Sequence, residues 1–209
     1  MFADRGDAGR QLARLVAALD LEPPVLVVGL PRGGVPVAAE VARRLGAPLD
    51  VVLVRKIGVP GHRELAMGAL GEGGIVVRSE DVIGAAGVRP DEFAAAVERA
   101  RGELDAQARR FRGDRSAAPL AGHTVVIVDD GIATGATARA ACQVARAAGA
   151  SRIVLATPVA PEGWEDGFAD VADVTVAVDS PTHFGAVGAF YRDFSDTSDG
   201  EVLRALGVS

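Results

Sequence analysis

The chain is poor in cysteine, lysine and aromatic residues. Of its 209 residues, one is a cysteine (Cys142), one is a lysine (Lys56) and 4% are aromatic. A single cysteine excludes a disulfide within the chain, and we expect a buried thiol in a reducing cytosol. No apolar run approaches the roughly 18 residues of a membrane-spanning helix, and the acidic N-terminal segment lacks the apolar core of a signal peptide. We therefore expect a cytoplasmic protein without a membrane partner.

A surplus of basic residues is also missing. Acidic residues outnumber basic ones 28 to 22, which argues against a nucleic-acid partner, because such a partner needs a basic face. Histidine, cysteine and glutamate show no zinc-site spacing. Hydrophobic residues make up 49% of the chain and charged residues 24%, as in globular proteins. The length suits one α/β domain with a small cap, and we predict a single domain over residues 1–209.

The most informative stretch runs from Val125 to Thr137. Four β-branched residues come first, without polar alternation, which predicts a strand buried on both faces of a parallel sheet. Asp129 and Asp130 follow where that strand would end. A loop of small residues then opens into an Ala- and Arg-rich helix predicted for residues 138–148. Because ligands of open α/β sheets bind at the carboxyl ends of the strands, we expect a binding site here.

The residues of this stretch suit a sugar phosphate. A small-residue loop at a helix N-terminus offers free N–H groups and a favourable dipole to an anion, and two threonines add hydroxyl groups. We therefore predict a phosphate site made of Ala133, Thr134, Gly135, Ala136 and Thr137. Asp129 and Asp130 would accept hydrogen bonds from sugar hydroxyls or hold a hydrated Mg²⁺. An ordinary strand–loop–helix with surface acids explains less of the pattern, and a Walker B strand lacks its G-x-x-x-x-G-K-[ST] partner in this chain.

A second loop of small residues follows another buried strand, Val25–Gly29. It contains Arg32, Gly33 and Gly34 and leads into a helix predicted for residues 37–45. Its N–H groups and its guanidinium would hold a second anion. A third strand is predicted for Leu49–Val54, followed by Arg55 and Lys56.

Three further expectations concern the rest of the chain. The glycine-rich segment from Ile57 to Leu70 is predicted to be a mobile loop. The helix predicted for residues 91–112 carries arginines that we interpret as a solvated face, Arg112 among them. Asp4 and Arg5 either decorate the surface or reach a site, and the first alternative is favoured.

The stretch from Val125 to Thr137 resembles the motif with which type I phosphoribosyltransferases bind phosphoribosyl pyrophosphate (PRPP). That motif consists of a hydrophobic strand, two acids, three small residues and Thr-Gly-x-Thr, and every position matches. The resemblance implies an α/β fold with a Rossmann-like parallel β-sheet flanked by helices. It also implies a core at about residues 24–158 and a hood, defined here as residues 1–23 and 159–209, that covers the strand ends.

The resemblance also implies roles for particular residues. Asp129, Asp130, Arg32 and Lys56 would be catalytic, and the two aspartates would hold Mg²⁺ through water. Ala133 to Thr137 would bind the 5-phosphate, while the pyrophosphate would meet Arg32, Gly33, Gly34, Arg55 and Lys56. A flexible loop containing His62, Arg63 and Glu64 would close over the substrate.

The function implied is transfer of ribose 5-phosphate from PRPP to an acceptor resembling a nitrogenous base, with release of pyrophosphate and with Mg²⁺ as cofactor. The ends of the chain match no hood of a particular base-specific enzyme, so the acceptor stays open. The aromatic residues gathered beyond residue 160 either stack on that acceptor or pack the hood on the core. A regulatory protein that senses PRPP is the alternative, and a hydrolytic or phosphorolytic enzyme is a third reading. The family often forms dimers, so a homodimer is also an expectation.

Overall fold

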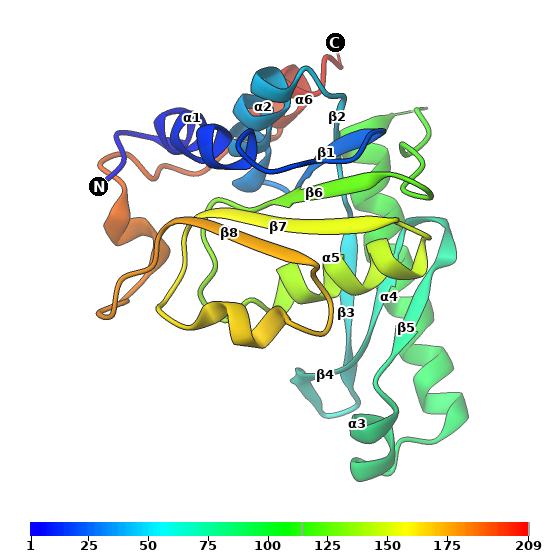
Figure 1. Cartoon of the computed structure of the whole chain (residues 1–209). Helices are drawn as coiled ribbons and strands as arrows, with labels where there is room; N and C mark the ends of the chain where they lie inside the picture. The colour runs from blue at the N-terminus through cyan, green and yellow to red at the C-terminus, as the bar shows by residue number, and fades with distance from the viewer. Residues whose placement is uncertain (114, 209) are drawn as a thin grey trace.

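Five parallel strands form the centre of the computed structural model, which describes residues 1–113 and 115–208 except the side chain of Arg63 (Figure 1). The strands lie in the order β2-β1-β6-β7-β8. Every residue of β6 is buried, as expected for the middle strand of a sheet covered on both faces. The predicted α/β class is therefore confirmed. The strand bounds are β1 Val25–Gly29, β2 Leu49–Val51, β6 Thr124–Val128, β7 Arg152–Val159 and β8 Val174–Asp179.

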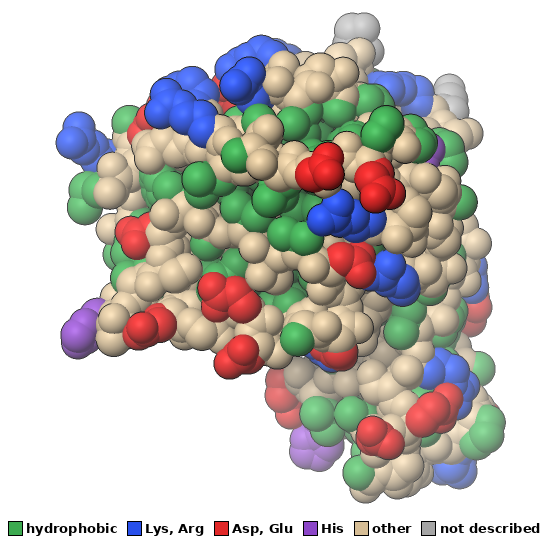
Figure 2. All heavy atoms as spheres, viewed as in Figure 1, with side chains coloured by type: hydrophobic (Ala, Val, Ile, Leu, Met, Phe, Trp, Pro, Cys, Tyr) green, Lys and Arg blue, Asp and Glu red, His purple; other side chains and the backbone are tan. Residues whose placement is uncertain are grey.

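Helices cover the two faces of this sheet. α1 (Arg5–Val16) and α2 (Gly34–Leu45) pack on one face, and α5 (Ala136–Ala147) packs on the other (Figure 1). β8 is the edge strand, and most of its residues are only half-buried. Figure 2 shows apolar side chains at the surface along this edge.

A second, antiparallel sheet extends away from the parallel one. It contains β3 (Val54–Val59), β4 (His62–Gly71) and β5 (Val76–Arg78) in that order. α4 (Pro90–Arg112) packs on one face of this sheet and α5 on the other. α5 therefore lies between the two sheets, and its own buried residues are mostly alanines, which allow the close approach. The short elements η1 (Glu72–Gly74) and α3 (Glu80–Ala85) flank β5.

The end of the chain returns to the carboxyl edge of the parallel sheet. It contains η2 (Trp164–Phe168), η3 (Val187–Phe190) and α6 (Asp199–Ala205). Phe2 pairs with Tyr191 in an isolated β-bridge, so the two ends of the chain meet. The segments predicted as a hood, residues 1–23 and 159–209, also contain α1, which packs on a face of the parallel sheet, and β8, which is one of its strands.

The strand predicted for Leu49–Val54 is in fact two strands. β2 ends at Val51, and the N–H of Val52 still donates to the carbonyl of Gly29 at 3.2 Å. The chain then leaves the parallel sheet, and β3 begins at Val54 in the other sheet. The sequence conceals this break because both sheets bury their residues here, which leaves one continuous apolar run.

The segment from Ile57 to Leu70 is not a loop, so the corresponding prediction is wrong. It forms the β3–β4 hairpin, which turns at Pro60 and at Gly61, whose φ is +81°. Gly68 is needed for close strand packing, since a Cβ there would lie 2.4 Å from the carbonyl oxygen of Val77. The glycines that suggested flexibility therefore serve tight pairing and turning.

Arg112 is also placed differently from the prediction. Its side chain is 7% exposed, and its guanidinium binds Asp50 and both carboxylate oxygens of Glu72. It also donates to the carbonyl of Val51 at 2.7 Å. This arginine anchors α4 to the junction of the two sheets and is not part of a solvated face.

Candidate active site

The acid pair lies directly after the buried strand β6. Asp129 and Asp130 are half-buried, and the N–H of Asp130 donates to Oδ1 of Asp129 at 3.0 Å. Burial raises the pKa of Asp129 well above its ordinary value, and the neighbouring charge of Asp130 raises it further. Perturbed carboxylates at the carboxyl edge of a parallel sheet are typical of functional sites.

The loop that contains Gly33 and Gly34 packs directly against this acid pair. A Cβ on Gly33 would lie 1.9 Å from Oδ2 of Asp130, and one on Gly34 would lie 2.5 Å from the carbonyl oxygen of Val128. The N–H of Leu30 also donates to that carbonyl at 2.9 Å. At Gly34 a side chain would collide with the backbone of the strand end, whereas at Gly33 it would collide with the carboxylate of Asp130. The two motifs found in the sequence therefore form one site.

The loop after the acid pair opens into α5. Ala133, Thr134 and Thr137 are exposed, and α5 begins at Ala136. Gly135 is the N-cap residue, with φ of +69°, and provides no capping side chain. The first N–H groups of the helix and the two threonine hydroxyls therefore remain accessible to an anion. The loop is also supported from behind, because a Cβ on Gly135 would lie 2.6 Å from the ring of Phe168.

Arg5 reaches the acid pair, contrary to the favoured expectation that it decorates the surface. Its Nε lies 2.7 Å from Oδ2 of Asp130, and the two side chains are 13% and 16% exposed. Its Nη1 donates to the carbonyl of Ser195 at 2.6 Å, and its guanidinium lies 4.1 Å from the ring centroid of Phe194. No local signal in the sequence could find this contact, because Arg5 and Asp130 are 125 positions apart.

Tyr191 is a second residue whose place in the site was missed. Its hydroxyl donates to the backbone carbonyl of Asp130 at 2.5 Å, and burial raises the pKa of this phenol. Its ring packs on Phe2 and Phe194, with centroid distances of 5.3 and 4.9 Å. The sequence offered only its membership of an aromatic-rich end segment.

The other aromatic residues of this segment mostly serve packing. Trp164 and Phe168 are buried and pack against each other. They belong to the hydrophobic cluster that also contains the buried residues of α5. Phe184 and Phe190 stack at a centroid distance of 5.4 Å and are half-buried. The packing interpretation therefore holds for Trp164, Phe168 and Tyr191.

Comparison with known proteins identifies the family. Residues 4–194 match the family model described as "Phosphoribosyl transferase domain". The chain belongs to the phosphoribosyl transferase family.

Two relatives illustrate the membership. The protein named "Putative phosphoribosyl transferase Rv0571c", from Mycobacterium tuberculosis, is 55% identical over 208 residues, which are 99% of this chain and 46% of the relative. The chain thus spans about half the length of this curated relative. The crystal structure of TT1426 from Thermus thermophilus superposes with a TM-score of 0.90 at 45% identity, over 98% of this chain and 97% of that one.

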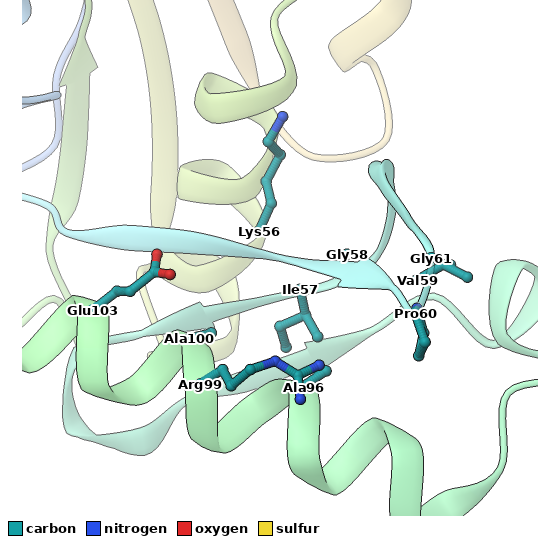
Figure 3. Close-up of a pocket in the computed structure, with 10 residues that line it drawn as sticks. All are labelled: Lys56, Ile57, Gly58, Val59, Pro60, Gly61, Ala96, Arg99, Ala100 and Glu103. Carbon is teal, nitrogen blue, oxygen red and sulfur yellow. The ribbon is translucent and has the colours of Figure 1, made fainter.

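Two neighbouring residues of this phosphoribosyl transferase domain, predicted to share one role, lie on opposite faces of β3. Arg55 lies on the α4 side, where its Nε is 3.6 Å from Glu103. Lys56 is exposed and points to the other side (Figure 3). A cavity of about 340 Å³ lies between β3 and α4, and Figure 3 shows Arg99 and Glu103 on the side of the strand opposite to the Lys56 ammonium. One anion therefore does not meet both residues in this structure.

The residues predicted for a flexible loop lie at the tip of the β3–β4 hairpin. His62 and Glu64 are exposed, with Nδ1 and Oε1 3.4 Å apart. The side chain of Arg63 lies outside the described part of the chain. The hairpin belongs to the second sheet, which extends away from the parallel sheet (Figure 1).

Metal and membrane features can be stated for the described residues only. Over residues 1–113 and 115–208, no group of three or more His, Cys, Asp or Glu side chains is placed to hold a metal ion. Among the helices formed by those residues, none combines the length and the apolar character that crossing a membrane requires.

Proposed function

We propose that this domain transfers ribose 5-phosphate from PRPP to an acceptor resembling a nitrogenous base and releases pyrophosphate. The observation that carries the proposal is the direct contact of the Gly33–Gly34 loop with Asp129 and Asp130, followed by the accessible N-terminus of α5. Two anion-binding backbone segments thus flank one acid pair. That is the arrangement a sugar with a phosphate at one end and a pyrophosphate at the other requires.

Each part of the site has a role in this proposal. Residues 133–137 bind the 5-phosphate through backbone N–H groups and the hydroxyls of Thr134 and Thr137. Asp129 and Asp130 accept hydrogen bonds from the ribose hydroxyls and offset the positive charge that develops on the sugar ring. The N–H groups of Gly33 and Gly34 stabilise the departing pyrophosphate. Holding both ends of the substrate orients the anomeric carbon toward the acceptor.

The acid pair also fits a Mg²⁺ ion held largely by substrate and water oxygens. Carboxylate oxygens suit this ion, and a protein site with two of them leaves most positions to other ligands. Asp130 Oδ2 already accepts a hydrogen bond from Arg5. The other oxygen of Asp130 and the carboxylate of Asp129 are therefore the available ligands for the metal ion. When bound, Mg²⁺ would neutralise charge on the pyrophosphate.

Three broader expectations remain part of the proposal. The terminal segments, residues 1–23 and 159–209, provide a hood over a single domain, except for α1 and β8, which belong to the layers of the parallel sheet. The protein works in the cytoplasm, without nucleic acid, and forms a homodimer. The acceptor stays unnamed.

Calorimetric titration with PRPP, with and without Mg²⁺, tests the proposal. We expect Mg²⁺-dependent binding that Asp130→Asn weakens by more than about tenfold, or about 1.4 kcal/mol. Asp81→Asn, an exposed change on α3, is the matched control. Equal affinity of the two variants would remove Asp130 from the site.

Two further measurements complete this test. Replacing both Thr134 and Thr137 with Ala should raise the Kd for ribose 5-phosphate, while Thr182→Ala in the exposed end segment should not. Pyrophosphate release in the presence of candidate acceptors then separates a transferase from a PRPP sensor. Tight PRPP binding without release for any acceptor would favour the sensor.

A further inference from the structure

The outer edge of β8 is a row of backbone groups that lack a partner. The N–H of Asp173 donates to the carbonyl of Ile153 in β7 at 2.9 Å, so β8 turns its odd-numbered residues toward β7. Backbone groups of successive strand residues point to alternate sides, which leaves those of Val174, Val176 and Val178 pointing away from β7. Within the described part of the chain, no strand pairs with β8 on that side.

The opposite edge of the same sheet is covered. The guanidinium of Arg112 donates to the carbonyl of Val51 in β2 at 2.7 Å, and the N–H of Ala118 donates to the carboxylate of Asp50 at 2.7 Å. Proteins protect edge strands by such covering segments, by charged residues or proline, and by bulges. Residues 174–178 of β8 contain no charge and no proline, and their register with β7 has no bulge. This edge therefore remains open to another strand.

Apolar side chains flank the open edge on both faces of the sheet (Figure 2). The three valines pack on the cluster formed with α1 and α2, whereas Ala177 packs on the cluster of α5, and all are half-buried. Leu15 of α1 is 42% exposed. It lies on the flank of α1 opposite to Ala13, which lines the groove toward α2. Because α1 packs over β7 and β8, Leu15 extends the apolar surface on the β8 side.

The sequence of β8 is nearly symmetric about Val176. It reads Asp-Val-Thr-Val-Ala-Val-Asp over residues 173–179. In an antiparallel pairing about a two-fold axis at Val176, Val174 of one copy lies opposite Val178 of the other, and Val176 lies opposite itself. The residues with unpartnered backbone groups then form hydrogen-bonded pairs, each of which exchanges two N–H···O=C bonds. A second copy of the chain therefore matches this edge in both backbone and side chains.

The charges at the strand ends suit the same pairing. It brings Asp179 of one copy opposite Asp173 of the other. Asp173 is already neutralised by Arg146, whose Nη2 lies 2.7 Å from its carboxylate. Arg146 is 42% exposed, so its guanidinium is accessible to a second carboxylate. The exposed Asp179 of the partner copy would thus meet a cation and not an isolated like charge.

We propose that β8 is the contact between two copies of this chain, which pair antiparallel and join their parallel sheets into one continuous sheet. This assigns a surface to the expected homodimer and does not depend on the transferase activity. The two-fold axis stands perpendicular to the sheet, so the α1 helices of both copies lie on the same face. Because the strands of the two copies run in opposite directions, the two acid pairs lie at opposite ends of the joint sheet.

The single cysteine of the chain permits a direct test. Cys142 is buried, so Val176→Cys introduces one thiol at the proposed axis without a competing accessible one. Opposite residues of a hydrogen-bonded pair have Cα atoms about 5.5 Å apart, a separation that suits a disulfide. Under mild oxidation we expect Val176→Cys to form a disulfide-linked dimer at least about tenfold faster than Thr182→Cys, because the pairing holds its two thiols together. Thr182 is exposed and lies beyond the strand. Non-reducing electrophoresis measures both rates.

Light scattering on the wild-type chain gives a second measurement. At about 50 μM we expect twice the monomer mass of 21.3 kDa. Val176→Lys should return the mass to that of a monomer, because two ammonium groups would meet at the axis, whereas Thr182→Lys should leave the dimer intact. Circular dichroism verifies that the lysine variant is folded. If it is not, the cysteine pair decides the proposal.

The outcomes separate this interface from other arrangements. A wild-type chain that is monomeric at about 50 μM overturns the proposal and leaves the edge to another occupant. A dimer in which Val176→Cys cross-links no faster than Thr182→Cys also overturns it, since another face then holds the copies together. Neither measurement uses PRPP or turnover, so the result is independent of the proposed transferase.

Discussion

Cys142 shows how a single residue reflects the packing of the whole core. It lies in α5, between the two sheets, and its side chain is fully buried. Burial raises the pKa of its thiol from 9.0 to about 12, although Arg139 and Arg146 oppose the shift. The expectation of a buried thiol is therefore confirmed.

This raised pKa predicts a pH dependence of stability. Below pH 9 the thiol is protonated in both the folded and the unfolded chain, so its contribution is fully present. Between pH 9 and about 12 the unfolded chain loses the proton while the folded chain keeps it, so rising pH favours unfolding. The stability advantage of wild type over Cys142→Ala should therefore shrink across this window, as measured by urea unfolding. A constant difference would contradict the prediction.

At the scale of elements, the junction of α2 with the end of β6 depends on Gly34. A Cβ at this position would lie 2.5 Å from the carbonyl oxygen of Val128 and 2.9 Å from Cα of Asp129, both of which belong to the backbone. Neither neighbour can move without shifting the acid pair. The helix and the strand end are therefore held at a separation that only glycine permits.

We predict that Gly34→Ala destabilises the protein by about 1–3 kcal/mol through overpacking. Gly102→Ala is the control, because Gly102 is an exposed position within α4 and a Cβ there meets no atom within 4 Å. That change should stabilise the protein by about 0.5–1 kcal/mol, since alanine is the better helix former. Chemical unfolding measures both, and a neutral Gly34→Ala would show that the junction can relax.

At the scale of the whole molecule, Arg5 joins three distant parts of the chain. It extends from the start of α1, binds Asp130 after β6, and contacts Phe194 and Ser195 near the C-terminal end. Tyr191 and Phe2 reinforce this meeting point. The two ends of the chain are thus held against the acid pair, as the proposed hood requires.

Replacing Arg5 by a neutral residue should lower the stability of the folded protein. Arg5→Gln leaves Asp130 beside Asp129 without its partner, and we expect a loss of about 3 kcal/mol in the free energy of unfolding at neutral pH. Arg10→Gln is the matched change on the same helix. The Arg10 side chain is 53% exposed and lies 3.8 Å from Asp7, so its loss should cost no more than about 0.5 kcal/mol. Similar losses for both variants would mean that the Arg5 contact adds nothing specific.

The sequence by itself determined the parts of this protein that depend on near neighbours. The buried strand from Thr124 to Val128, the two acids after it and the helix that follows are all local patterns. A strand that ends in such a loop presents the acids and the start of the helix at one place, independently of the rest of the fold. The same holds for the parallel sheet, because continuous β-branched runs and intervening helices allow few other folds. The Gly33–Gly34 loop lies beside the acid pair because β1 pairs with β6, and the sequence analysis did not predict that strand order.

Only the tertiary structure decided which distant side chains meet. Arg5 and Asp130 pair across 125 positions, and no periodicity or spacing encodes that contact. Arg55 and Lys56 are adjacent in sequence yet separate, because successive side chains of a strand point to opposite faces. The segment from Ile57 to Leu70 became a hairpin because α4 and α5 cover its two faces, and burial between those helices provides what the glycine-rich sequence alone does not. Local patterns thus set the binding loops, whereas long-range packing set their charged and aromatic surroundings.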